Sequence, residues 1–281
     1  MNTQNTGSNS ALNPIGLGYP AQAILGLSIV IFIYLIFFSA EYLYRLITGY
    51  NKQRTDLIPF TASSSGKSYT LAQDPSNPEA KTIHLSDNER TGVEFTYIFF
   101  IYIDPATFQE HDGLLHVLHK GYTSMYPLLG PGVFIRSTKN TMRVYMNTFA
   151  SWKKYIDIDD IPVKKWVQVA LVCETGGLTI FINGNVAKRM NFDNSVPYQN
   201  YGDIHVFNDR RMNDTRQGVA DADKFNLFGK MTGMLSNLFY YNYALSYTEI
   251  NAHMTEGPSS KTDPLSQDKP QYLTDNWWVN K

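Results

Sequence analysis

An uncharged apolar segment near the N-terminus is the feature that most constrains this 281-residue chain. Residues 21–40 contain no charged side chain and include the run AILGLSIVIFIYLIFF. About 20 residues at a helical rise of 1.5 Å cross the ~30 Å hydrocarbon core of a bilayer. We therefore predict one transmembrane helix over residues 21–44. The preceding residues 1–20 are uncharged and rich in Asn, Ser and Gly, which predicts a disordered polar tail.

The residues that follow this segment predict its orientation. Tyr42, Tyr44 and Arg45 come directly after it, as expected of side chains at a membrane interface. Arg45 is the first basic residue of the chain, so the positive charges lie on the C-terminal side. We expect a single-pass protein with its N-terminus outside and its large domain on the cytoplasmic side. A cleaved signal peptide is disfavoured, because nothing basic precedes the apolar run and residues 38–40 form a poor cleavage site.

The composition of the remainder indicates one globular, β-rich domain. The 19 Tyr and 16 Phe favour strands over helices. A net charge of -1 gives no broad electrostatic reason to expect nucleic acid as a partner. Cys173 is the single cysteine, so no intramolecular disulfide can form, which fits a reducing compartment.

Runs with a period of two predict the strands of an antiparallel sandwich. They are rich in β-branched and aromatic residues, and no comparable helical pattern separates them. The runs lie at residues 93–103, 114–120, 132–137, 142–148, 166–173 and 178–184. Asn183-Gly184 predicts a tight hairpin, and Ser246 with Glu249 predicts a capping box that opens one short C-terminal helix.

The pattern divides the rest of the chain into three parts. Residues 45–88 are rich in Ser, Pro, Gly and Asn and are predicted to be a linker and first edge strand, followed by the sandwich over residues 89–255. Residues 256–281 are predicted to be an extended tail. In this tail Tyr272, Trp277 and Trp278 have no evident core to enter, so we expect them either to bind a partner or to dock onto the sandwich.

Three segments, in order, resemble the laminin-G-like branch of the concanavalin-A-like lectin/glucanase superfamily. KKWVQVALVCETGGLTIFINGNVAKRM at 164–190 is similar to the family's Trp, apolar strand, Gly turn and strand that ends in Asn-Gly. FNLFGKMTGMLSNLFYYNYALSYTEI at 225–250 is similar to its closing signature, and VEFTYIFFIYI at 93–103 takes the place of its early aromatic strand. The resemblance implies a mainly β, jelly-roll-like antiparallel sandwich that contacts its ligand or partner on a concave face or through loops at one rim.

The superfamily includes glucanases, so the carboxylates must be considered. Retaining glycosidases need two carboxyl groups about 5 Å apart, and the glucanases of this fold carry them in a Glu-x-Asp-x-x-Glu or Glu-x-Asp-x-Glu pattern. The nearest match, residues 155–160, has Tyr155 at the first carboxylate position, although Asp157 and Asp159 share a strand face. We therefore predict no catalytic residue and no enzyme activity.

Calcium is the one cofactor that the resemblance suggests, because several members hold it at a loop rim. The candidate rim residues are Asp203, Asp209, Asp214, Asp221 and Asp223. Their spacing does not resemble an EF-hand and equally suits a polar loop. His116 and His119 are expected on opposite faces of a strand, and no Cys or carboxylate completes a zinc set. No metal site is therefore predicted.

These observations favour a membrane-anchored, non-catalytic structural or protein-interaction module. Single-span chains with laminin-G-like domains look similar to predicted structural proteins of large DNA viruses, which implies a minor capsid role, a capsid partner and a virion internal membrane. Two alternatives stay open: a carbohydrate-binding, lectin-like receptor domain, and a membrane-bound glycan hydrolase suggested by fold analogy alone. The lipid bilayer is the partner common to all three.

Overall fold

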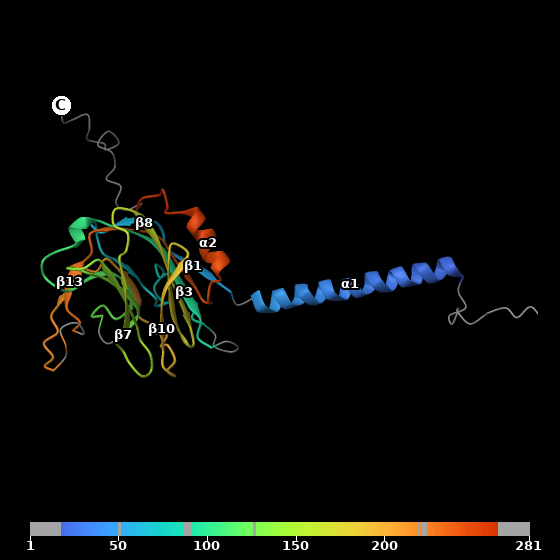
Figure 1. The fold of residues 1–281 in the computed structure, drawn as a ribbon, viewed down its shortest axis with the longest axis horizontal. Coiled ribbons are helices and arrows are strands. Elements are labelled where there is room, and N and C mark those ends of the chain that lie inside the picture. Colours follow the sequence, from blue (N-terminus) through green and yellow to red (C-terminus); the bar gives the residue numbers. More distant parts are fainter. Residues whose placement is uncertain are drawn as a thin grey trace, which may run out of the picture. The chain divides into compact units, whose positions relative to one another are not determined.

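The computed structural model describes residues 18–49, 52–86, 92–125, 128–218, 220 and 224–263 (Figure 1). The chain divides into two compact units, Met1–Lys52 and Gln53–Lys281. The first contains a helix and the second a β-sandwich with one further helix.

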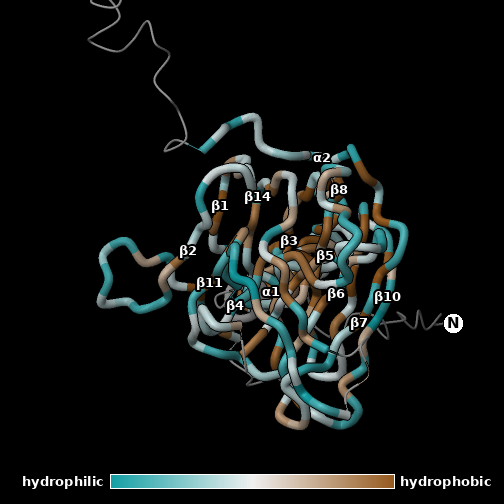
Figure 2. Tube along the Cα trace, turned by 90° about the vertical axis from the view of Figure 1, so that its left-hand side faces the viewer, coloured by the Kyte–Doolittle hydropathy of each residue, from teal (hydrophilic) through white to brown (hydrophobic). Residues whose placement is uncertain are grey.

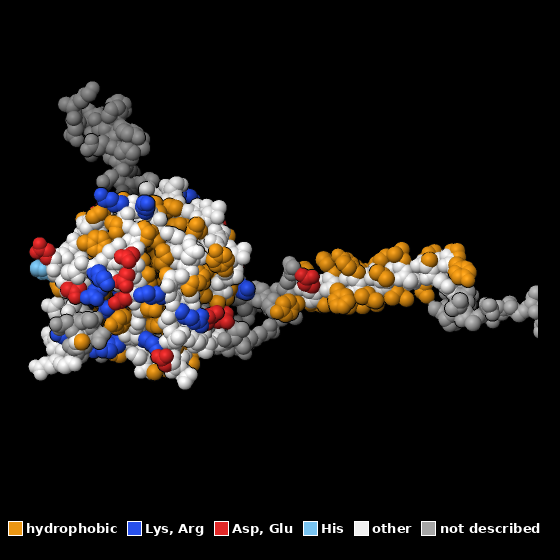
Figure 3. Space-filling model, in the orientation of Figure 1, with side chains coloured by type: hydrophobic (Ala, Val, Ile, Leu, Met, Phe, Trp, Pro, Cys, Tyr) orange, Lys and Arg blue, Asp and Glu red, His pale blue; other side chains and the backbone are white. Residues whose placement is uncertain are grey.

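The first unit contains α1 (Tyr19–Gly49). Within the described residues, α1 is the one helix that is long and apolar enough to cross a membrane, with its apolar stretch at Tyr19–Tyr44. Exposed apolar side chains occupy every position from Ile29 to Phe38, and Figure 3 shows them along one face of the helix. Apolar residues at consecutive helical positions are typical of a helix surrounded by lipid. Tyr42 and Tyr44 are exposed at the C-terminal end of this stretch. The side chain of Arg45 lies outside the described residues.

The second unit consists of two packed sheets. Sheet A is six-stranded, in the order β1 (Arg54–Ser63), β14 (Gly233–Tyr241), β3 (Phe95–Ile103), β8 (Trp166–Glu174), β9 (Gly177–Ile182) and β10 (Asn185–Asn191). Sheet B is eight-stranded, with a main path of β12 (Arg211–Met212), β13 (Leu227–Lys230), β4 (Leu114–Gly121), β5 (Leu129–Arg136), β6 (Thr141–Met146) and β7 (Lys154–Asp159). β11 (Asp203–Val206) also pairs with β4, and β2 (Tyr69–Leu71) pairs with β11. All described pairs are antiparallel except β13 with β4. The mainly β sandwich expected from the sequence is confirmed.

The main core fills the space between the two sheets, where the hydrophobic segments gather (Figure 2). Alternate residues of β8, Val167, Val169 and Leu171, are fully buried in it, as their period of two predicts. The predicted hairpin joins β9 to β10, with Asn183 at φ 49° and Gly184 at φ 75°. Both residue types tolerate positive φ, which the tight turn requires. A short 3₁₀ helix, η1 (Pro105–Thr107), follows β3.

The outer face of sheet A is covered by α2 (Tyr247–Glu256). Ile250 of α2 is buried in a second cluster with Ile98 of β3 and Phe239 of β14. The helix begins at the predicted capping box: the Glu249 backbone N–H donates to Ser246 Oγ at 3.4 Å, and the Ser246 N–H donates to Glu249 Oε2 at 2.7 Å. The sequence-predicted C-terminal helix is therefore confirmed together with its cap.

Removal of the cap should weaken the sandwich by a small, measurable amount. We expect Ser246→Ala to lower the free energy of unfolding by about 1 kcal/mol, because the first turn of α2 loses its side-chain acceptor. Denaturant unfolding monitored by tryptophan fluorescence measures the change. The matched control is Thr248→Ala, an exposed position in the same turn that should change stability by less than about 0.5 kcal/mol. Equal losses in both variants would contradict a capping role.

The first edge strand, expected within residues 45–88, is β1, and it places the start of the sandwich at Arg54 rather than near residue 89. β1 buries Leu57 and Ile58 in the core and pairs with β14 along its length. Pro59 lies where the pairing register shifts, a position where an edge strand accepts Pro. The Ser- and Pro-rich surroundings of this short apolar run make it resemble a linker in the sequence. The described start of the C-terminal tail lines this edge, since the Thr61 N–H donates to the Lys261 carbonyl at 2.7 Å.

Candidate functional site

Several connections between strands meet at one end of the sandwich, which we call the loop rim. It comprises the β4–β5 connection, the β6–β7 loop (147–153), the β8–β9 turn (175–176) and the β10–β11 segment (192–202). Backbone contacts hold these loops together: the Phe149 N–H donates to the Val196 carbonyl at 3.1 Å, and the Ala150 N–H donates to Ser195 Oγ at 3.0 Å. The rim is therefore a structured surface built from segments that are far apart in the sequence.

A groove of about 420 Å³ lies on this rim, and we call it the rim groove. The β8–β9 turn forms one side and the segment after β10 the other, with a lining of Thr175, Gly176, Asn191, Asp193, Asn194, Ser195 and Val196. Asp193 and Asn194 have φ values of 47° and 63°, in the left-handed region that Asp and Asn adopt more readily than other side chains. The Asp193 carboxylate pairs with the ammonium of Lys154.

The chemistry of the rim groove suits a ligand rich in hydroxyl groups. Amide, hydroxyl and carboxylate groups line it, and together they can both donate and accept hydrogen bonds. Phe149 lies beside Val196 with 73% of its surface exposed, and its ring contacts Tyr198 edge-on at a centroid distance of 5.2 Å. An exposed aromatic ring next to polar groups can pack against the apolar face of a sugar ring. The volume falls in the range of small-molecule sites.

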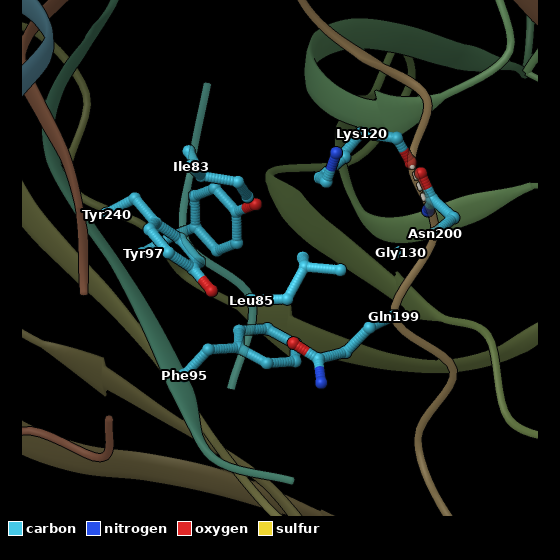
Figure 4. Close-up of a pocket in the computed structure, with 9 residues that line it drawn as sticks. All are labelled: Ile83, Leu85, Phe95, Tyr97, Lys120, Gly130, Gln199, Asn200 and Tyr240. Atoms are coloured by element: carbon cyan, nitrogen blue, oxygen red, sulfur yellow. Dashed lines mark hydrogen bonds between the residues drawn. The ribbon is translucent and has the colours of Figure 1, made fainter. Parts of the chain in front are cut away.

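A second, much smaller cavity lies between the sheets near the rim (Figure 4). Its volume is about 10 Å³, room for a single water molecule and for no organic ligand. The Lys120 ammonium borders it and donates to the Gly202 carbonyl at 2.5 Å, and burial lowers the pKa of Lys120 to about 8. The Tyr240 hydroxyl also borders the cavity and is buried without a hydrogen-bond partner, which a bound water would supply.

The histidines of β4 differ from the sequence expectation, which was wrong about their direction. A register shift between His116 and Leu118 places an extra residue in β4, so Val117 and Leu118 both enter the core. The alternation of side chains moves by one residue, and His116 and His119 therefore lie on the same outer face of sheet B. Their rings meet edge-on at 4.9 Å, and His205 of β11 stacks on His119 at 4.7 Å.

Hydrogen bonds fix the protonation of these two imidazoles. The Asn208 N–H donates to His116 Nδ1 at 2.9 Å, so this nitrogen is an acceptor and the proton of the neutral ring is on Nε2. His116 Nε2 then donates to His119 Nδ1 at 2.7 Å, and His119 Nε2 donates to the Tyr122 carbonyl at 2.9 Å. Burial, the largest cause, lowers the pKa of His116 well below its ordinary value and that of His119 to about 3. We call this chain the histidine relay; it ties residues 122 and 208 to sheet B.

The carboxylates nearest to a glucanase pattern both have cationic partners. Asp157 accepts two hydrogen bonds of 2.7 Å from Arg143, one from Nε and one from Nη2. Asp159 accepts from Thr141 at 2.7 Å and lies 3.1 Å from the Lys139 ammonium, and these contacts lower the pKa of Asp159. A general acid of a glycosidase needs a raised pKa, and the pKa of Asp159 is shifted the other way. The contacts of both carboxylates join β6 to neighbouring side chains and support the sheet.

The described candidate rim aspartates differ in their surroundings. The Asp203 carboxylate accepts a hydrogen bond from the Gln73 N–H at 2.9 Å, and Asp209 is exposed. Arg216 donates to the Asp214 carboxylate and holds the pKa of Asp214 well below its ordinary value. Asp221 and Asp223 lie outside the described residues. Within the part of the chain that the structure describes, no group of three His, Cys, Asp or Glu side chains could hold a metal ion.

The remaining sequence candidates are the aromatic residues of the C-terminal tail. Tyr272, Trp277 and Trp278 lie outside the described residues, so their docking stays a prediction. Sequence analysis missed the groove itself. The polar turn NFDNS at 191–195 and the turn ETGG at 174–177 were its only local signals, and their pairing with Phe149 depends on the fold.

Two sheets packed around one core, antiparallel except for the β13–β4 pair, with a groove in the loops at one end, define a β-sandwich domain. Residues 77–251 match the family model described as the concanavalin A-like lectin/glucanases superfamily. The chain belongs to this superfamily, as its resemblance suggested. No curated protein matches the chain.

Several solved structures are similar to the chain. The receptor binding domain of botulinum neurotoxin D is 13% identical with a TM-score of 0.47, over 74% of this chain and 48% of that one. The binding domain of botulinum neurotoxin DC in complex with SialylT is 14% identical with a TM-score of 0.46, over 73% and 46%. The serotype D ligand binding domain in complex with N-acetylneuraminic acid is 11% identical with a TM-score of 0.44, over 72% and 51%. The chain spans about half the length of these structures.

Proposed function

We propose that this protein is a membrane-anchored, lectin-like binding module that recognises carbohydrate in the rim groove. The observation that carries the proposal is the groove of about 420 Å³, which amides and hydroxyls line. The backbone of Phe149, whose ring is exposed, donates a hydrogen bond to the lining residue Val196. Sugars present both hydroxyl groups and apolar ring faces, so a site for them needs both kinds of side chain. Membership of the superfamily supports the same function.

The anchor in this proposal is α1. Its apolar stretch is 26 residues long, which exceeds the length that crosses a bilayer. An N-terminal apolar helix also occurs in signal sequences. Retention as a span is supported by the missing basic residue before the apolar run and by Tyr42, Tyr44 and Arg45 after it. The same charge asymmetry supports a cytoplasmic sandwich, and protease protection of the sandwich in sealed, cytoplasm-out vesicles would overturn that orientation.

Binding to a glycan array tests the proposed ligand class. The array is incubated with the full chain in lipid nanodiscs, once with and once without calcium. We expect saturable binding to a subset of the glycans. Asn194→Gly keeps the left-handed backbone but removes the amide, and Phe149→Ala removes the ring. Each should weaken binding at least about tenfold, a loss of ~1.4 kcal/mol.

The control for this experiment is Tyr247→Ala, which removes a similarly exposed aromatic side chain from α2. It should bind as the unchanged protein does. Phe149 is exposed, so its replacement should leave stability nearly intact and separate lost binding from lost folding. An array that stays blank in both calcium conditions would overturn the carbohydrate proposal.

A protein-interaction role, including a minor capsid role at a virion membrane, is the function that the sequence analysis favours, and it is our second candidate. Its support is the single apolar helix joined to this sandwich and the tail that carries Tyr272, Trp277 and Trp278. Photo-crosslinking from Trp277 or Trp278 in the native assembly tests it: a crosslinked partner chain supports it, and crosslinks confined to the chain's own sandwich contradict it.

A further inference from the structure

Two tyrosines of the loop rim stand out by their exposure. Tyr201 has 82% and Tyr122 has 54% of its surface exposed. They lie next to each other in the fold, because Gly121 pairs with Asp203 across β4 and β11. We call Tyr122 and Tyr201 the tyrosine pair. It stands apart from the rim groove, whose lining includes neither residue.

The backbone beneath the tyrosine pair is firmly held. The Tyr122 carbonyl accepts from His119 at 2.9 Å at the end of the histidine relay. On the other side, the Gly202 carbonyl accepts from the buried Lys120 ammonium at 2.5 Å, and Asn200 is 1% exposed and donates to the Lys120 carbonyl at 3.1 Å. Two large side chains are therefore presented to solvent from a fixed backbone, so little additional order is required when they bind a surface.

The two ends of the sandwich differ in character. The loop rim exposes the tyrosine pair, Phe149 and Val196. At the opposite end, the described loops present charged residues such as Lys139, Lys164 and Asp160, and Val186 and Met254 are exposed near the β9–β10 turn. The exposed aromatic side chains of the described loops lie at the rim, which suits a partially apolar partner on that side.

The course of the chain indicates which partner is near. Arg54, the first residue of β1, pairs with Tyr241, next to Tyr240 of the cavity beside the rim, so the chain enters the sandwich at the rim end. From Gly49, the last residue of α1, to Arg54 there are five Cα–Cα steps, a reach of at most about 18 Å. The opposite end is a further ~30 Å away, the length of a nine-residue strand. The short connection that follows the apolar stretch therefore enters the sandwich at the rim end, which also carries the tyrosine pair.

From this we propose that the tyrosine pair is a second membrane contact, which seats the edge of the sandwich near β2 and β11 on the headgroup layer of the bilayer that α1 crosses. Tyrosine is suited to this layer because its ring is apolar and its hydroxyl remains hydrated. The contact rests on the anchoring part of the proposed function and is independent of carbohydrate binding. It would hold the rim groove at a fixed height above the lipid.

Site-specific fluorescence in vesicles tests this contact with the full chain. Cys173 is fully buried, so a fluorophore attaches to an introduced cysteine. One reporter is Thr123→Cys, an exposed site beside Tyr122; a second is Lys139→Cys at the opposite end; a third is Ser28→Cys in α1. The chains are reconstituted in phosphatidylcholine vesicles that contain lipids with a quencher on the headgroup or, separately, deep in the acyl chain.

We expect the headgroup quencher to reduce the Thr123 signal severalfold more than the Lys139 signal. Replacement of both tyrosines, Tyr122→Ser with Tyr201→Ser, should remove this difference while glycan binding persists. Equal quenching at Thr123 and Lys139 would overturn the proposal. A Thr123 signal that changes with the density of protein in the vesicle and not with the quencher would also overturn it, because that result indicates contact with a second copy of the chain. The Ser28 reporter separates the two hypotheses: no quenching there by the deep quencher would refute the anchor itself.

Discussion

Arg143→Ala should destabilise the sandwich by about 3 kcal/mol, one of the largest losses from a single polar side chain in this protein. Arg143 lies in β6, beside the edge strand β7 of sheet B, with only 3% of its side chain exposed, and it binds both oxygens of Asp157. Its guanidinium also lies 3.9 Å above the ring centroid of Tyr155. Truncation would leave Asp157 charged without its partner in a site that is only partly open to water. Denaturant unfolding of the detergent-solubilised chain measures the loss.

A surface ion pair provides the matched control. Arg189 and Glu174 are 2.9 Å apart, and both side chains are nearly half exposed. Arg189→Ala should cost under about 1 kcal/mol, because water solvates the remaining carboxylate. The double variant Arg143→Met with Asp157→Leu should recover much of the loss of Arg143→Ala, since no buried charge remains unpaired. If Arg143→Ala cost no more than Arg189→Ala, the pair would not support the sheet.

Local patterns predicted much of this fold. The alternation in β8 and β9, the Asn183-Gly184 turn and the Ser246 capping box each depend on residues close in sequence, and the structure confirms them. The apolar α1 is likewise a matter of length and composition. These features need no knowledge of which strands are neighbours.

The candidate site could not be predicted in the same way. The rim groove brings residues 175–176 beside residues 191–196, and the contact with Phe149 depends on a loop more than 40 residues earlier. The direction of His119 depends on one extra residue in β4, which reverses the alternation without any local signal. Residues 45–88 were predicted to be a linker and first edge strand, but the bounds of that strand could not be predicted, because the burial of β1 comes from pairing with the distant strand β14.

The histidine relay leads to the second large effect, a loss of stability in mild acid. His116 and His119 have folded-state pKa values below the ordinary 6.5, because burial disfavours the charged imidazolium. Below pH 6.5 the unfolded chain therefore binds protons that the folded chain does not, and the free energy of unfolding falls with falling pH. For His119 this continues down to about pH 3. Each of the two imidazoles should cost about 2 kcal/mol at pH 5.

The slope of stability against pH distinguishes this effect from general acid sensitivity. Carboxylates contribute little between pH 6.5 and 5, because they titrate near pH 4 in the unfolded chain. His119→Gln should lower stability at pH 7, since His116 loses its acceptor, and it should also reduce the slope by about 1.4 kcal/mol per pH unit. His116, together with His205 and His253, whose pKa values burial also lowers, would account for the remaining slope. If the slope of the free energy of unfolding against pH were the same in the His119→Gln variant, the histidine relay would accept protons in the folded state. The loops at residues 122 and 208 would then not depend on neutral imidazoles.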